Sequence, residues 1–156
     1  MDYTLSMTDR ETHPPNPDFA ETTKRFLMDM PIAQHFGFVV TGVGLGLFEI
    51  TQPFRNELSF RPGIFQAGPV GTLADMAAAC AGMTMLPCGW AASTVDYTIK
   101  LIAPAAGDKI VARGRVVRAG RTLSVTASDV YVVREGKEAL CATALATIRN
   151  FEASGS

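Results

Sequence analysis

Residues 65–84 predict a helix that is apolar on every side except for one carboxylate, that of Asp75. A helix without a polar face is normally buried inside a protein, and its many small residues would let strands approach closely. We expect it to begin near Gly68, with Gly68 as N-cap and Pro69 at the first position, and to end at residues 86–87. A lone buried carboxylate costs free energy unless it is paired, hydrogen-bonded or used in chemistry. Asp75 is therefore the first candidate for a functional residue.

The rest of the chain predicts one further helix and a series of strands. Residues 17–30 predict an amphipathic helix with Asn16 as N-cap, and residues 55–65 predict a loop. Strands are expected at residues 38–43 and 45–54 before the apolar helix, and at 94–101, 110–117, 122–133 and 139–148 after it. Short turns join the last four strands, which predicts an antiparallel meander. Such a sheet can curl around the long helix, so we expect an α+β fold.

The composition indicates a single domain. The 156 residues are 47% apolar and 19% charged, and we expect a flexible tail at residues 1–16 and one domain at residues 17–151. With 14 basic and 15 acidic residues the net charge is −1, which favours neither nucleic acid nor a membrane surface as a partner. Cys80, Cys88 and Cys141 lack metal-type spacing. We therefore expect buried, reduced thiols in a cytoplasmic protein, with no metal, no signal peptide and no membrane-spanning helix.

Two separate motifs resemble those of the hotdog-fold acyl-CoA thioesterases, in particular the PaaI-like branch of the 4-hydroxybenzoyl-CoA thioesterase superfamily. The first is Phe65-Gln66-Ala67-Gly68 followed by Leu73-Ala74-Asp75-Met76-Ala77. The second is Thr94-Val95-Asp96 followed by Leu101-Ile102-Ala103-Pro104-Ala105-Ala106-Gly107-Asp108. The resemblance covers about residues 31–151 and implies a hotdog fold, in which a curved antiparallel sheet wraps a long central helix.

The resemblance also assigns roles to residues. The family has a His-Gly-Gly or His-Ala-Gly turn, and its catalytic acid lies eight positions after the second residue of that turn. Here the turn is Gln66-Ala67-Gly68, and Asp75 lies eight residues after Ala67. The resemblance implies that Asp75 is the catalytic carboxylate, that the backbone of Ala67 and Gly68 binds the thioester carbonyl, and that Thr94 orients the water.

This chain departs from the family at two positions. Gln66 replaces the usual histidine, and Phe60 stands where many relatives have an asparagine, although Asn56 would reach the site if its loop folded inward. A helix N-terminus offers free N–H groups that can form an oxyanion hole. The sequence leaves open whether Asp75 attacks directly or activates a water, or whether it makes a structural pair with an arginine across an interface. For Thr94, an ordinary place in a strand is an equal alternative to a role in the site. For Gln66, support of the loop is an equal alternative to lining the site.

The substrate-binding residues are expected at two other places. Relatives hold the nucleotide part of CoA with basic residues near the turn that here contains Arg118, Gly120 and Arg121, although a solvated turn is an equal alternative. Weaker candidates for the same role are Lys100 and Arg113. Apolar side chains from the helix and from a facing subunit are expected to line the acyl pocket, with Met76, Met83, Phe60 and Phe65 as candidates.

We therefore expect a hydrolase that splits an aryl- or medium-chain acyl-CoA into the free acid and CoA, without a metal or redox cofactor. An open sheet leaves edges, so we expect a homodimer or a dimer of two dimers. A non-catalytic acyl-CoA-binding protein is the main alternative. A hotdog dehydratase or isomerase is a weaker one, because neither His13 nor His35 lies near the acidic helix in the sequence.

Overall fold

The computed structural model describes residues 14–153 of the chain, so most of the predicted tail lies outside the described residues. The helices are α1 (Phe19–Met28), α2 (Pro31–Phe36) and α3 (Ala67–Met83), with a short 3₁₀ helix, η1 (Asn56–Leu58). The strands are β1 (Val39–Gly44), β2 (Leu47–Pro53), β3 (Ser59–Arg61), β4 (Ile64–Phe65), β5 (Trp90–Leu101), β6 (Lys109–Arg118), β7 (Leu123–Arg134) and β8 (Lys137–Glu152). Within residues 14–153, no helix is both long enough and apolar enough to cross a membrane.

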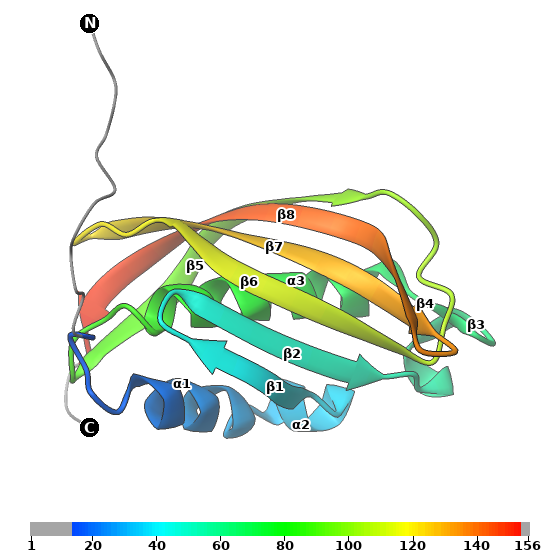
Figure 1. Cartoon of the computed structure of the whole chain (residues 1–156), viewed down its shortest axis with the longest axis horizontal. Helices are drawn as coiled ribbons and strands as arrows, with labels where there is room; N and C mark the ends of the chain where they lie inside the picture. The colour runs from blue at the N-terminus through cyan, green and yellow to red at the C-terminus, as the bar shows by residue number, and fades with distance from the viewer. Residues whose placement is uncertain (1–13, 154–156) are drawn as a thin grey trace, which may run out of the picture.

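A six-stranded antiparallel sheet curves over α3, and β3 and β4 form a separate hairpin next to the start of α3 (Figure 1). The strand order in the large sheet is β1-β2-β6-β7-β8-β5. Helices α1 and α2 lie along the β1 side of the sheet, and α1 contacts both β1 and α3. The predicted architecture of a long central helix wrapped by an antiparallel sheet is confirmed.

Helix α3 is buried because small apolar residues let it lie directly on the sheet. Leu73, Ala74, Ala77 and Ala81 are fully buried in the main core. Gly114 on β6 faces the helix backbone, and a Cβ at this position would overlap the carbonyl oxygen of Ala77. The Ser128 hydroxyl on β7 donates a hydrogen bond to the Ala74 carbonyl (2.7 Å), which ties this part of the helix to the sheet.

The predicted start of the long helix is wrong by two residues. The N-cap is Gln66 rather than Gly68, and Pro69 occupies the third helical position. The reason is that the Gln66 side chain itself accepts a hydrogen bond from the Gly68 N–H and so caps the first turn. The helix also ends at Met83, and the Thr84 hydroxyl then accepts from the Gly46 N–H (2.7 Å).

The predicted N-terminal helix is also shorter than expected. Asp18 rather than Asn16 is the N-cap of α1, and the Asn16 side chain instead accepts from the Asp18 N–H (2.9 Å) in a turn before the helix. Pro31 opens the separate helix α2, and Gly37 ends it in the left-handed conformation (φ 70°). The predicted loop at residues 55–65 contains η1 and the β3–β4 hairpin.

The predicted four-stranded meander is wrong for its first strand. β6, β7 and β8 follow one another as expected, but β5 pairs with β8 and not with β6. Both edges of β6 are already occupied, by β2 and by β7, so β5 takes the free edge of β8. β5 therefore becomes the last strand of the sheet, and its other edge has no partner among the described residues.

Candidate active site

Asp75 lies on the side of α3 that the sheet leaves partly uncovered. Its side chain is half-buried, and one carboxylate oxygen accepts a hydrogen bond from the Thr94 hydroxyl on β5 (2.8 Å). A β-bulge between Thr94 and Asp96 makes this contact possible, because a bulge re-aims the side chains of its strand. The structure thus brings together two of the predicted site residues, which are 19 positions apart.

Burial raises the pKa of the Asp75 carboxyl above its ordinary value, and the Thr94 hydrogen bond offsets part of this rise. In the part of the chain that the structure describes, no arginine or lysine forms an ion pair with Asp75. The nearby Cys80 thiol is fully buried, and burial together with the charge of Asp75 raises its pKa to about 12. The Asp75 carboxyl therefore keeps its proton to higher pH than an ordinary aspartate, whereas Cys80 is an inert thiol.

The turn Gln66-Ala67-Gly68 forms the N-terminus of α3 and is exposed. The first-turn N–H groups of a helix have no acceptor within the helix, and they carry the positive end of its dipole. The Gln66 side chain occupies the Gly68 N–H, which leaves the Ala67 N–H as the donor that can meet a carbonyl oxygen. The predicted pair of backbone donors is thus reduced to one by the residue that replaces the family's histidine.

Asp75 and Ala67 are eight residues apart on one helix, which separates them by about 12 Å along its axis. A thioester carbonyl cannot contact both groups of one protomer at this separation, because a hydrogen bond requires atoms about 3 Å apart. The structure therefore contains both predicted parts of the machinery without joining them within a single chain.

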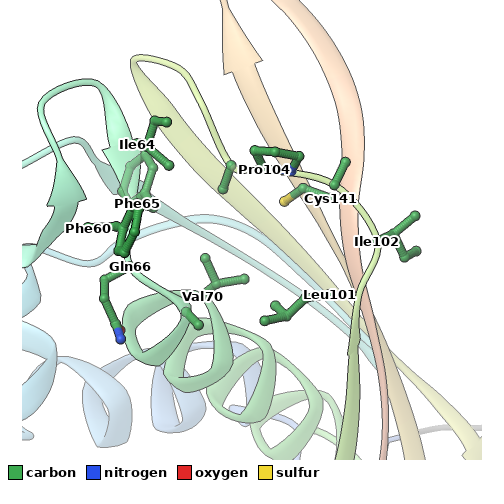
Figure 2. Close-up of a pocket in the computed structure, with 12 residues that line it drawn as sticks. Phe60, Ile64, Phe65, Gln66, Val70, Leu101, Ile102, Pro104 and Cys141 are labelled. Carbon is green, nitrogen blue, oxygen red and sulfur yellow. The ribbon is translucent and has the colours of Figure 1, made fainter.

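A cavity of about 530 Å³ opens beside the N-terminus of α3 (Figure 2). This volume lies within the range of small-molecule sites. The lining comes from the β3–β4 hairpin, the start of α3, the last residue of β5 with the segment after it, and one residue of β8: Phe60, Ile64, Phe65, Gln66, Ala67, Val70, Leu101, Ile102, Ala103, Pro104, Ala105 and Cys141. Phe60 and Phe65 were predicted for an acyl pocket and line this cavity, whereas Met76 and Met83 do not.

Arg118, Gly120 and Arg121 lie at the turn between β6 and β7, as predicted. Both arginines are exposed, and the turn is at the opposite end of the sheet from the β3–β4 hairpin (Figure 1). The Asn150 side chain fixes the turn by donating to the Gly120 carbonyl oxygen (2.8 Å) and to the Ser124 hydroxyl (2.9 Å). Within one protomer, these residues therefore do not meet the Gln66-Ala67-Gly68 turn.

The weaker candidates have other surroundings. Arg113 donates to Glu49 (2.7 Å) and, with two nitrogens, to Glu138 (2.7 and 2.8 Å), so its charge is already paired. Lys100 and His35 are exposed, and His35 lies on α2. Asn56 begins η1, where its carbonyl oxygen accepts from the Ser59 hydroxyl (2.6 Å). Among residues 14–153, no three His, Cys, Asp or Glu side chains gather as a metal site would require. Cys80 and Cys141 are buried as predicted, whereas Cys88 is exposed, so the prediction of a buried thiol is wrong at that position.

Sequence reasoning missed Tyr97 and Cys141 as residues near these sites. The Tyr97 hydroxyl lies close to Gly71, one helical turn before Asp75, since a Cβ on Gly71 would be 3.4 Å from it. Cys141 reaches the cavity from β8. Each residue lies at or just beyond a β-bulge, between Thr94 and Asp96 or between Val130 and Tyr131, and strict alternation along a strand hides such positions.

Comparisons with known proteins find the same fold in thioesterases. The family model of the thioesterase superfamily matches residues 67–139. A thioesterase family protein from Silicibacter pomeroyi has 28% identity and a TM-score of 0.83, over 86% of this chain and 98% of that one. A phenylacetic acid degradation-related protein from Ralstonia eutropha JMP134 has 26% identity and a TM-score of 0.69, over 81% and 98%. No curated protein matches the sequence significantly.

The fold is also that of the PaaI protein of E. coli, from the phenylacetic acid degradation operon. That structure has 18% identity and a TM-score of 0.76, over 89% of this chain and 97% of that one. The predicted resemblance and the predicted hotdog architecture are thereby confirmed. Residues 67–139 match the family model of the thioesterase superfamily, within a chain that has the hotdog fold of these proteins.

Proposed function

We propose that this protein hydrolyses acyl-CoA thioesters with Asp75 as its catalytic carboxylate. The observation that carries the proposal is the contact between Asp75 and Thr94. The Thr94 hydrogen bond holds a half-buried carboxylate on the partly uncovered side of the central helix. Among residues 14–153, this carboxylate has no cationic partner. A carboxylate with a structural role inside its own chain would normally have an arginine or lysine of that chain beside it. The match of residues 67–139 to the thioesterase superfamily supports the reaction class.

The reaction needs a nucleophile and a donor for the developing oxyanion. In one route, Asp75 takes a proton from a water that Thr94 helps to orient, and the water oxygen attacks the thioester carbon. In the other route, the Asp75 carboxylate attacks that carbon itself, and water then hydrolyses the anhydride. In both routes the C–S bond breaks, and the CoA thiolate leaves and takes up a proton. The Ala67 N–H is the proposed donor to the carbonyl oxygen.

A homodimer would bring these two parts together. The uncovered side of α3 presents Gly68, Thr72, Asp75 and Ala79 at helical spacing, and β5 beside it has a free edge. A second copy related by a two-fold axis near the middle of this stripe would place its Ala67 opposite Asp75. Each dimer would then hold two sites, each with the carboxylate from one protomer and the N–H from the other. A dimer of two dimers is an extension of the same proposal.

The proposed substrate is an aryl- or medium-chain acyl-CoA. Arg118 and Arg121 are proposed to bind the phosphates of CoA, because an exposed guanidinium group recognises phosphate well. No metal or redox cofactor is part of the proposed reaction. We place the reaction in the cytoplasm, because Cys80, Cys88 and Cys141 are unpaired.

A non-catalytic acyl-CoA-binding protein is the second candidate, and one observation favours it. Gln66 occupies the Gly68 N–H, so the N-terminus of α3 offers fewer donors to an oxyanion than a turn without this cap. Such a protein would bind acyl-CoA and be stabilised by it without releasing CoA.

The experiment that separates these functions is a panel of acyl-CoAs with a thiol reagent that detects free CoA. We expect turnover by the wild-type protein and a fall in kcat of about 10²–10⁴-fold in Asp75→Asn, the range for loss of a general base. The variant should keep its fold, because asparagine can still accept a hydrogen bond from Thr94. Thermal stabilisation by acyl-CoA without CoA release would instead identify a binding protein. Unchanged turnover in a folded Asp75→Asn variant would exclude the catalytic role.

A further inference from the structure

The cavity beside α3 runs from an exposed mouth to a buried floor. Phe60 at the mouth is 71% exposed, whereas Phe65 and Val70 are buried and Cys141 at the floor is only 1% exposed. Figure 2 shows Phe65 and Val70 on the side of the hairpin and helix, and Pro104 and Cys141 on the opposite side. The Gln66 amide end points away from these side chains, toward the helix that it caps.

A β-bulge places Cys141 at this floor. Val130 pairs with Ala142 and Tyr131 pairs with Leu140, so Cys141 is the extra residue between them on β8. Its thiol donates to the Val130 carbonyl oxygen (3.3 Å), which the bulge leaves available. Its own carbonyl oxygen accepts from the N–H groups of Ile102 (2.8 Å) and Ala103 (3.2 Å). This single residue therefore provides the floor through its side chain and holds one wall through its backbone.

The lining determines what the cavity can bind. It contains no charged side chain, and its polar side chains are those of Gln66 and Cys141. The Gln66 amide is turned away, and the Cys141 thiol already has an acceptor. A charged or strongly hydrogen-bonding group at the far end of a ligand would thus lose its hydrogen bonds to water and find no partner here. An apolar chain or ring has no such hydrogen bonds to lose when it enters.

We propose that this cavity binds the acyl group of the substrate, that it selects uncharged apolar acyl groups, and that Cys141 sets the greatest length they can have. The proposal rests on the proposed function, because the Ala67 N–H at the edge of the cavity is where the thioester carbonyl would bind. It adds a substrate class and a specificity-determining residue to that function. Cys141 contacts the acyl group and takes no part in the chemical step.

The charge selection is tested with two six-carbon substrates, hexanoyl-CoA and adipoyl-CoA, which differ by a terminal carboxylate. We expect kcat/KM to be at least about 100-fold higher for hexanoyl-CoA, because the apolar floor cannot solvate a carboxylate. Equal kcat/KM values for the two substrates would overturn the proposed selection.

The length limit is tested with Cys141→Leu and Cys141→Ala, assayed with butanoyl-CoA and decanoyl-CoA. Cys141→Leu fills the floor and should lower kcat/KM for decanoyl-CoA relative to butanoyl-CoA by about 10-fold or more. Cys141→Ala deepens the floor and should raise the same ratio. Cys88→Leu is the matched control, because Cys88 is exposed and does not line the cavity, and it should leave the ratio unchanged.

The two variants decide the proposal even if one does not fold. A decanoyl-to-butanoyl ratio that stays at the wild-type value in the folded variants would overturn the role of Cys141. If the wild-type protein releases no CoA from any substrate, the proposed hydrolysis fails. The affinities of the same two acyl-CoAs, measured by titration calorimetry with wild-type and variant proteins, then decide the pocket proposal. A length-dependent loss of affinity in Cys141→Leu would support it, and unchanged affinities would overturn it.

Discussion

At the scale of single residues, the electrostatics of Asp75 depend on two opposing effects. Partial burial removes water from the carboxylate and raises its pKa, while the Thr94 hydroxyl donates to the charged form and lowers it. Burial is the larger effect. Activity that requires ionised Asp75 should therefore be lost as the pH falls through a pKa above the ordinary aspartate value.

The Thr94 hydroxyl can be removed without changing the shape of its side chain. In Thr94→Val the carboxylate loses its hydrogen bond, so the pKa of Asp75 should rise further and the acidic limb of the kcat/KM profile should move to higher pH. Thr94→Ser keeps the hydroxyl and should keep the limb near its wild-type position. The measurement is kcat/KM against pH for the three proteins. A limb at the same pH in Thr94→Val would show that Asp75 does not control the profile.

The raised pKa of Asp75 also predicts a pH-dependent effect on stability. The folded state binds the Asp75 proton more tightly than the unfolded state, so its contribution to stability is present at acidic pH and lost as pH rises through the folded pKa. Asp75→Asn removes this dependence. We expect the variant to be more stable than the wild type near neutral pH, with the difference shrinking in acid. Urea unfolding at both pH values measures this, and a larger advantage in acid would contradict it.

At the scale of elements, the contact between α3 and the sheet depends on Gly114. A Cβ here would overlap the Ala77 carbonyl oxygen, and both atoms belong to rigid backbone. We expect Gly114→Ala to destabilise the fold by roughly 3 kcal/mol or more, because the helix or the strand must shift. Gly44→Ala is a suitable control, since its Cβ would lie at an ordinary 3.5 Å from Leu47 and should change stability by about 1 kcal/mol or less. Urea denaturation compares the two, and equal effects would show that close packing at Gly114 is not limiting.

The sequence predicts the helices and strands that are determined by residues close together in the chain. An apolar run of this length, rich in alanine and glycine and ended by a proline, predicts a buried helix, and the spacing from Ala67 to Asp75 places both residues on it. The start of α3 was less predictable, because glutamine is not among the usual N-caps and its side chain had to fold back onto Gly68.

Features that depend on strand pairing were not predictable from the sequence. The place of β5 next to β8 follows from the occupation of both edges of β6, which is a property of the whole sheet. The bulge at Val95 gives Thr94 its contact with Asp75, and the bulge at Cys141 places a thiol in the cavity. For this reason the motif identified Asp75 and Thr94, whereas Cys141 was read only as a buried thiol.

At the scale of the whole molecule, the free edge of the sheet and the divided site point to the same assembly. The edge strand β5 exposes Val95, Tyr97 and Leu101 beside the uncovered side of α3. An exposed apolar edge strand normally finds a partner. Two negative charges in place of Val95 and Tyr97, which do not line the cavity, should therefore give a monomer, and the monomer should lose activity because it lacks the partner's N–H group. Analytical ultracentrifugation and the CoA-release assay test both parts, and a fully active monomer would contradict the shared site.

A mixing experiment tests directly whether the two halves of the site come from different protomers. Ala67→Pro removes the N–H donor at a position where proline is tolerated, and Gln66 already has the extended conformation that precedes proline (φ −74°, ψ 151°). Asp75→Asn and Ala67→Pro should each be inactive alone. Refolding them together at equal amounts should restore about a quarter of wild-type turnover, because half of the dimers are mixed and each contains one intact site. If the site lay within one protomer, every chain in the mixture would be defective, and no activity would return.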